Sequence, residues 1–406
     1  MERVYYTNRI YFETSFELPK ELQKQDLQEL INQATSSQFS IFLSKIDEKN
    51  GFIDKEATKK VLEVEDMNGP SIKDIHQHII DICEEDHENA FRCFFAIDDD
   101  DNHYMVIHAH HAIADGFMIT SFCQFLYHLY QKQEDHSLHF VDFNTIVKEE
   151  NLNYPDCWDA SNVQESVKQC IESIQPSTAF PTKEVSNHYK TTNTSRIIDS
   201  EVSKRAFITS HGYGSIHQVK HCIHGLLLWC YLRAVIKEDH LREGSLKIHT
   251  ITNLRRYLKN QGEISPNIFI SSFPTVHSIQ SILSHEENCA VMQKRVNDAL
   301  EKGLPLSLYL QQKWGSEEKV EEDGENEMEM EISNLGSHPE DCFTRSLITQ
   351  VIYANQGKNV LSIVVWTDCN KRIHLCGASD ECCMKQERLE KILDSFVHEV
   401  FECGVI

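Results

Sequence analysis

The chain opens with an alternating pattern of residues and continues with a helical one. Residues 3–13 alternate aromatic and polar types, which predicts a half-buried strand. Apolar residues then recur at helical spacing, and these are Leu22, Leu27, Leu30, Ile31 and Ala34. The sequence therefore predicts a strand followed by a helix.

A second group of elements surrounds residue 100. Phe91–Ile97 and Tyr104–His108 are β-forming runs separated by the polar residues 98–102, and this arrangement predicts a β-hairpin. The segment that follows predicts a helix with one apolar stripe, made of Phe122, Phe125, Leu126 and Leu129.

The pattern changes in the middle of the chain. From Ile174 to Arg196 periodicity is lost among Ser, Thr, Pro, Asn and Lys, which is typical of a linker or a long crossing loop. We place a domain boundary there and expect two domains, residues 1–180 and 181–406. Residues 219–235 form the most apolar helical stretch and predict a buried helix, whose His221 and His224 we expect to be packed or capping rather than catalytic.

The carboxy-terminal part returns to short β-forming runs separated by turns. A final helix is predicted for about Gln386–Phe401, with one apolar face. The predicted strands are Leu347–Tyr353, Val360–Trp366 and Arg372–Cys376. Strands mixed with helices in both parts of the chain indicate an α/β or α+β fold.

The charge balance excludes several classes of protein. The 406 residues include 39 Lys and Arg against 63 Asp and Glu, a formal net charge of −24. Nucleic acids and anionic lipid surfaces require a basic face, so we expect neither as a partner. No window approaches the roughly 18 apolar residues that span a bilayer, and the first 16 residues lack the apolar core of a secretory signal. We therefore expect a soluble, cytoplasmic protein.

The 14 cysteines are scattered and form no CxxC pair. In a large chain without an export signal, we expect them to be reduced thiols and expect no metal site. Nine acidic residues lie between Glu317 and Glu331. Because like charges that cannot be buried extend into water, we expect a solvated surface loop there rather than a cation or partner site.

The segment with the most chemical information is His108-Ala-His110-His111-Ala-Ile-Ala-Asp115-Gly116, between a predicted strand and a predicted helix. An imidazole titrates near neutrality and is able to accept a proton from a hydroxyl or amine. Two other interpretations compete with this one. His108 and His110 would share a strand face, as a pair of metal ligands does, and Asp115 before Gly116 is a common helix-capping arrangement.

Two further segments accompany this HHxxxDG sequence. They are Thr252-Asn-Leu-Arg255 and Ile332-Ser333-Asn334-Leu335-Gly336. With these three segments in this order and spacing, the chain resembles the HHxxxDG acyltransferase superfamily over nearly its whole length. That superfamily includes chloramphenicol acetyltransferases, plant BAHD acyltransferases, alcohol acetyltransferases and peptide-synthetase condensation domains. The DFGWG segment of the BAHD branch is absent after Gly336.

The resemblance implies an architecture. Superfamily members of this length are similar to two chloramphenicol-acetyltransferase-like halves in one chain, each a mixed sheet flanked by helices, with a tunnel at their interface. It also implies a monomer. The HHxxxDG sequence lies in the first expected half, and the other two segments lie in the second.

The resemblance also implies roles for individual residues. His111 matches the general base, and Ser333 matches a hydrogen-bond donor to the oxyanion of the tetrahedral intermediate. His110, Asp115 and Gly116 match structural positions, with Asp115 paired to Arg255, and Asn334 matches a tunnel-lining position. Without the histidine motif, the preferred interpretation of Ser333 and Asn334 is a strand end closed by side-chain to backbone hydrogen bonds.

These matches imply an enzyme that moves an acyl group from a thioester to the hydroxyl or amine of a small acceptor. The implied thioester is acyl-CoA, which acts as a co-substrate. No permanently bound cofactor is implied. One alternative keeps the fold and uses a thioester carried by a carrier protein. The other is a catalytically idle binding protein with the same fold.

Overall fold

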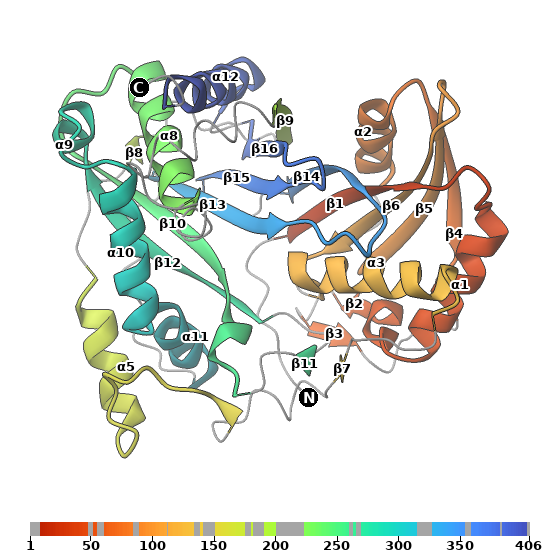
Figure 1. The fold of residues 1–406 in the computed structure, drawn as a ribbon, viewed down its shortest axis with the longest axis horizontal. Helices are drawn as coiled ribbons and strands as arrows, with labels where there is room; N and C mark the ends of the chain where they lie inside the picture. Colours follow the sequence, from red (N-terminus) through yellow and green to blue (C-terminus); the bar gives the residue numbers. More distant parts are fainter. Residues whose placement is uncertain are drawn as a thin grey trace. The chain divides into compact units, whose positions relative to one another are not determined.

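The computed structural model describes most of the chain and divides it into two compact units (Figure 1). The first unit comprises residues 1–152, 260–269 and 337–356, and the second comprises 153–259, 270–336 and 357–406. The described residues are 9–47, 52–54, 61–83, 89–111, 113–133, 139–140, 151–174, 180–181, 191–199, 223–259, 263–264, 269–314, 327–353, 359–381 and 384–403.

The first unit is built on a five-stranded sheet with the order β14-β1-β6-β5-β4. Only β4 and β5 pair in parallel, and the other neighbours are antiparallel. The strands are β1 (Arg9–Leu18), β4 (Val64–Gly69), β5 (Phe91–Asp98), β6 (His103–His110) and β14 (Arg345–Tyr353). One strand of this mixed sheet, β14, comes from the distant carboxy-terminal part of the chain.

Helices cover both faces of this sheet because successive side chains of a strand point to opposite faces. On one face, Phe12, Met105 and Ile107 pack with α1 (Lys24–Ser36) and α3 (Gly116–Tyr130). On the other, Phe94 and Val106 pack with α2 (Ile72–Cys83). The smaller elements are η1 (Ser40–Leu43), β2 (Lys45–Asp47), β3 (Phe52–Asp54), β7 (His139–Phe140) and β11 (Glu263–Ile264).

The second unit holds a seven-stranded sheet, whose main order is β12-β10-β13-β15-β16-β9. The pairing of β10 with β13 is parallel, whereas β10 with β12 and β16 with β15 and β9 are antiparallel. The strands are β8 (Phe180–Pro181, paired with β13), β9 (Thr191–Ile198), β10 (Ser245–Asn253), β12 (Ile270–Ser278), β13 (Glu327–Ser337), β15 (Asn359–Thr367) and β16 (Ile373–Asp380).

Helix α8 is the central helix of the second unit. It is buried along almost its whole length and packs against both α10 and α12. A Cβ on Gly225 would lie 2.3 Å from the Cys289 carbonyl oxygen, so only glycine allows this approach of α8 to α10. The helices are α5 (Val163–Glu172), α8 (Ile223–Glu238), η3 (Leu254–Tyr257), α9 (Ile279–Leu283), α10 (Cys289–Glu301), α11 (Leu304–Trp314) and α12 (Gln386–Cys403).

The mixed α/β architecture predicted from the sequence is confirmed, with two mixed sheets flanked by helices. The predicted opening strand and helix, the hairpin and the carboxy-terminal strands and helix are present as β1, α1, β5, β6, β14, β15, β16 and α12. Residues 3–8, His221 and 315–326 lie outside the described residues. Among the described helices, none combines the length and apolar character needed to cross a membrane.

Three segments differ from the sequence-based expectations. Thr191–Ile198, most of which was expected to be linker, forms strand β9, because Thr and Ile suit a half-buried edge strand. Residues 327–331, expected in an acidic loop, begin β13 with Met330 buried. Residues 153–180 belong to the second compact unit, although the expected division lies at residue 180. The contacts that define the units join segments distant in sequence, which local patterns do not record.

Candidate functional site

The histidines of the motif lie at the end of β6. His108 and His110 are inside the strand and are buried, at 1% and 4% exposure, whereas His111 follows the strand and is half-buried. The amide of His110 donates to the Ala90 carbonyl at 2.8 Å, and its own carbonyl accepts from the Ile113 amide at 3.0 Å. These bonds end the strand in a turn, so His111 is the motif histidine that keeps access to solvent.

The environment of His111 favours a neutral imidazole. Burial lowers its pKa, and this effect outweighs the opposing influence of a ring hydrogen bond to its own backbone and of the Asp115 carboxylate. A neutral imidazole has one N–H and one acceptor nitrogen. The acceptor nitrogen of the neutral ring is suited to accept a proton.

Asp115 connects two segments of the first unit. It is fully buried and is the N-cap of α3, where Oδ1 accepts a hydrogen bond from the Met118 amide at 2.8 Å. Its Oδ2 accepts a hydrogen bond from the Phe269 amide at 3.1 Å. Gly116 is the first residue of the helix. The capping interpretation weighed for Asp115 therefore describes one of its bonds, and the second bond links the motif to a distant segment.

Removal of the Asp115 carboxylate should destabilise the protein by more than an ordinary cap does. We expect Asp115→Ala to lower the free energy of unfolding by about 2–4 kcal/mol, because a cap bond and a second buried acceptor are lost together. Urea unfolding measures this change. The matched control is Asn288→Ala at the exposed N-cap of α10, with an expected cost of about 1 kcal/mol. Equal costs for the two variants would contradict this account of Asp115.

Arg255 lies in η3 of the second unit and is 4% exposed. Its backbone amide and Nη1 donate to Asn253 Oδ1 at 3.0 and 3.2 Å. Asn253 is thus the residue that closes β10 and begins the short helix. The pairing of Arg255 with Asp115 stays a prediction.

Ser333 and Asn334 lie on β13, next to β10. The parallel register pairs Ser333 with Ile251, so the second and third motif segments leave neighbouring strands at the same end of the sheet. Ser333 is half-buried, and its hydroxyl has no hydrogen-bond partner among the described residues. Asn334 Oδ1 accepts from the Gly336 amide at 2.9 Å, where Gly336 has a φ of +74°. The roles of Ser333 as oxyanion donor and of Asn334 as tunnel lining stay predictions.

A buried hydrogen-bond network next to the motif was missed by the sequence analysis. Glu13 Oε1 accepts from His108 Nδ1 at 2.9 Å, and Glu13 Oε2 accepts from His76 Nδ1 at 2.8 Å. His76 Nε2 lies 3.0 Å from Ser15 Oγ. All four residues are 2% exposed or less. Burial alone raises the pKa of the Glu13 carboxyl, but the hydrogen bonds from the two histidines lower it below its usual value.

The geometry of Ser15, His76 and Glu13 matches that of a serine, histidine and carboxylate triad, yet a substrate has no access to residues buried this completely. The network is therefore structural, joining β1, β6 and α2. It also accounts for His108, whose Nδ1 is used by Glu13. Within the described residues, no group of three or more His, Cys, Asp or Glu side chains could hold a metal ion.

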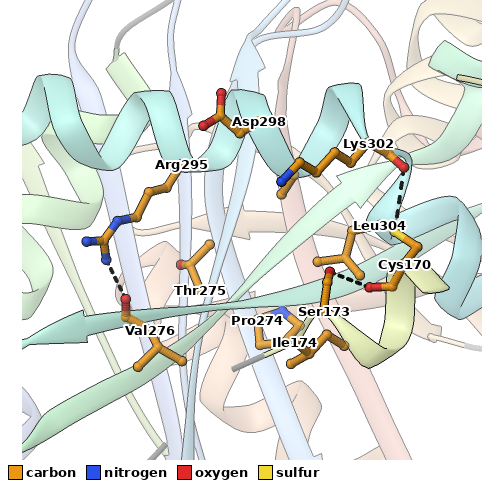
Figure 2. A pocket seen from close by; sticks show the side chains of 11 residues that line it. Cys170, Ser173, Ile174, Pro274, Thr275, Val276, Arg295, Asp298, Lys302 and Leu304 are labelled. Atoms are coloured by element: carbon orange, nitrogen blue, oxygen red, sulfur yellow. Dashed lines mark hydrogen bonds between the residues drawn. The ribbon is translucent and has the colours of Figure 1, made fainter. Parts of the chain in front are cut away.

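A cavity of about 300 Å³ lies in the second unit, away from the motif residues in the sequence (Figure 2). It lies between the end of α5, the edge strand β12 and α10, and no predicted site residue lines it. Arg295 Nη1 donates to the Val276 carbonyl at 2.5 Å, and Cys170 Sγ donates to the Lys302 carbonyl at 3.5 Å. Burial raises the pKa of the Cys170 thiol, so the thiolate nucleophile is disfavoured there.

Comparison with known proteins defines the class of fold. No protein-family model matches the sequence, and the search of curated proteins gives no significant match. Solved structures do match, and the shared fold is that of condensation domains and related acetyltransferases. The first condensation domain of the CDA synthetase matches with a TM-score of 0.66 and 12% identity, over 97% of this chain and 90% of that domain.

Two further matches come from outside that synthetase. Trichothecene 15-O-acetyltransferase from Fusarium sporotrichioides has a TM-score of 0.64 and 13% identity, over 98% of this chain and 91% of that protein. The SgcC5 protein from Streptomyces globisporus has a TM-score of 0.64 and 11% identity, over 98% and 92%. At these identities the comparisons confirm the fold that the motif resemblance implied.

Proposed function

We propose that the protein is an acyltransferase that moves an acyl group from a thioester to the hydroxyl or amine of a small acceptor. The observation that carries the proposal is the state of His111. Its imidazole is half-buried and has a lowered pKa, which favours the neutral ring with one acceptor nitrogen. That is the arrangement a general base needs at neutral pH. The fold shared with condensation domains and an acetyltransferase supports this reaction class.

In the proposed reaction the acceptor attacks the thioester carbonyl directly. The acceptor oxygen or nitrogen forms a bond to the carbonyl carbon while His111 takes its proton, which yields a tetrahedral intermediate. Ser333 is the proposed donor to the oxyanion, a type of contact worth about 10²–10³ in rate. Collapse of the intermediate breaks the carbon–sulfur bond, and the imidazolium returns the proton to the departing thiolate. No acylated cysteine is required.

The proposed donor is acyl-CoA, used as a co-substrate. A carrier-protein thioester is the alternative. Carrier proteins are commonly acidic, and a net charge of −24 makes docking of such a partner unfavourable unless a local basic patch offsets it. CoA also carries negatively charged phosphates, so the same net charge opposes its binding as well. The choice of acyl-CoA therefore follows from the family resemblance, and the donor is decided by offering both thioesters.

Mass spectrometry tests the donor directly. Purified protein is incubated with a pool of alcohols and amines and either a series from acetyl- to palmitoyl-CoA or an acyl-phosphopantetheinyl carrier protein. We expect free CoA and acylated acceptor in the first incubation. Product only in the second incubation would overturn the acyl-CoA assignment and retain acyl transfer. A mass readout is preferable to a thiol dye, because the 14 cysteines of the chain would react with the dye.

The pH dependence of the reaction follows from His111. Its imidazole is active when neutral, so kcat/KM should be constant at neutral pH and fall as the pH drops through its pKa. Because that pKa is lowered, the acidic limb should lie below pH 6.5, the usual value for histidine. Initial rates measured from pH 4.5 to 8.5 test this. An acidic limb with a midpoint above about 7 would contradict a buried neutral base.

A further inference from the structure

The proposed base has an aromatic neighbour on another strand. The ring centroids of Phe12 and His111 are 5.6 Å apart and their planes are at 72°, which is an edge-to-face contact. Phe12 is 9% exposed and lies opposite Ala109 in the pairing of β1 with β6. The contact therefore comes from a rigid strand in the sheet rather than from the turn that carries His111.

The Phe12 contact limits how the His111 ring can turn. The Phe12 ring packs edge-to-face beside the imidazole and comes from a neighbouring strand. Among the described residues, the charged group that acts on His111 is Asp115, which favours the protonated ring, and burial opposes it more strongly. An apolar ring at this distance excludes water from one side of the imidazole and so contributes to that burial.

We propose that Phe12 is the positioning residue for His111, fixing the orientation of the imidazole and excluding water from it. This inference rests on the proposed function. Phe12 itself does not touch the reacting atoms and acts through the histidine. A displacement of a catalytic group by about 1 Å lowers the reaction rate by up to about 100-fold.

The chain offers a closely matched control for this contact. Phe95 makes the same kind of edge-to-face contact with His103, at 5.3 Å and 71°, in the same sheet. Phe95 is 5% exposed, close to the value for Phe12. Phe95→Leu therefore removes an equivalent aromatic contact from a histidine outside the motif, with a similar loss of core packing.

The experiment compares Phe12→Leu and Phe95→Leu with the parent protein. NMR titration of histidine-labelled protein follows the pKa of His111, whose signal is assigned by its absence in His111→Gln. We expect Phe12→Leu to raise that pKa towards about 6.5 and to lower kcat by about 10- to 100-fold with little change in the acceptor KM. Phe95→Leu should leave all three values unchanged. If Phe12→Leu does not fold, Phe12→Met of similar volume replaces it.

An unchanged His111 midpoint and kcat in a folded Phe12 variant would overturn the positioning role. Equal effects of Phe12→Leu and Phe95→Leu would also overturn it, because the cause would then be general loosening of the sheet. Absence of transfer in the parent protein is a separate result and overturns the proposed function. The NMR titration still reports whether Phe12 controls the imidazole in that case.

Discussion

Replacement of His111 by alanine should lower kcat/KM for acyl transfer by about 10²–10⁴-fold, the range that a general base contributes. The remaining rate would come from the binding of the two substrates close together. Since the imidazole is half-buried and follows the strand, its removal should leave the fold intact. Steady-state rates together with urea unfolding curves measure both effects on the same preparation.

The matched control is His103→Ala at the opposite end of β6, where a buried histidine likewise contacts a phenylalanine ring. This variant should retain activity within a few-fold while losing some stability. Equal losses of activity in the two variants would mean that His111 has no special chemical role. A stable His111→Ala protein with full activity would exclude it as the base.

Replacement of Glu13 by alanine should be the most destabilising change considered for the first unit. It leaves His76 and His108 buried without their shared acceptor, and removal of one partner of a buried charged network costs about 3–5 kcal/mol. Glu13→Gln should cost less, about 1–2 kcal/mol, because an amide accepts from one imidazole and donates to the other after a tautomer change. Urea unfolding at pH 7 measures the changes in free energy.

The pH dependence gives an independent test of Glu13. Its pKa is lowered on folding, so its contribution is fully present above its unfolded pKa of about 4.3 and is lost as the pH falls through the folded value. The stability difference between the parent and Glu13→Gln should therefore shrink below about pH 4. The control is Glu17→Gln, an exposed position on the same strand. A difference that grows in acid would contradict the assignment of an ionised Glu13.

Local patterns in the sequence were sufficient for most of the fold. The β-forming runs predicted β5 and β6, which are buried on both faces, and the helical spacing of apolar residues predicted α12. Strand β9 was missed because its Thr-rich sequence resembles a loop when the neighbouring strand β16 is unknown. The start of β13 was masked by acidic residues that alternate with Met328 and Met330, an alternation that is itself a strand signal.

The candidate site also has a part that the sequence predicts and a part that it does not. The motif around His111 is contiguous in the sequence and was visible there. The hydrogen-bond partners of the motif residues lie far away in the sequence. Glu13 and His108 are 95 residues apart, and Asp115 and Phe269 are 154 residues apart. A single polar residue in an alternating strand gives no local signal that it faces a buried histidine. Such partners follow from the register of the sheet, which local patterns do not determine.

The central claim is that His111 catalyses acyl transfer from a thioester. The most direct measurement is mass-spectrometric detection of free thiol and acylated acceptor formed by the parent protein and by His111→Ala in parallel. We expect both products in equal amounts from the parent protein and almost none from the variant. Equal product from both proteins, or a parent protein that forms none with either an acyl-CoA or a carrier-protein donor, would contradict it.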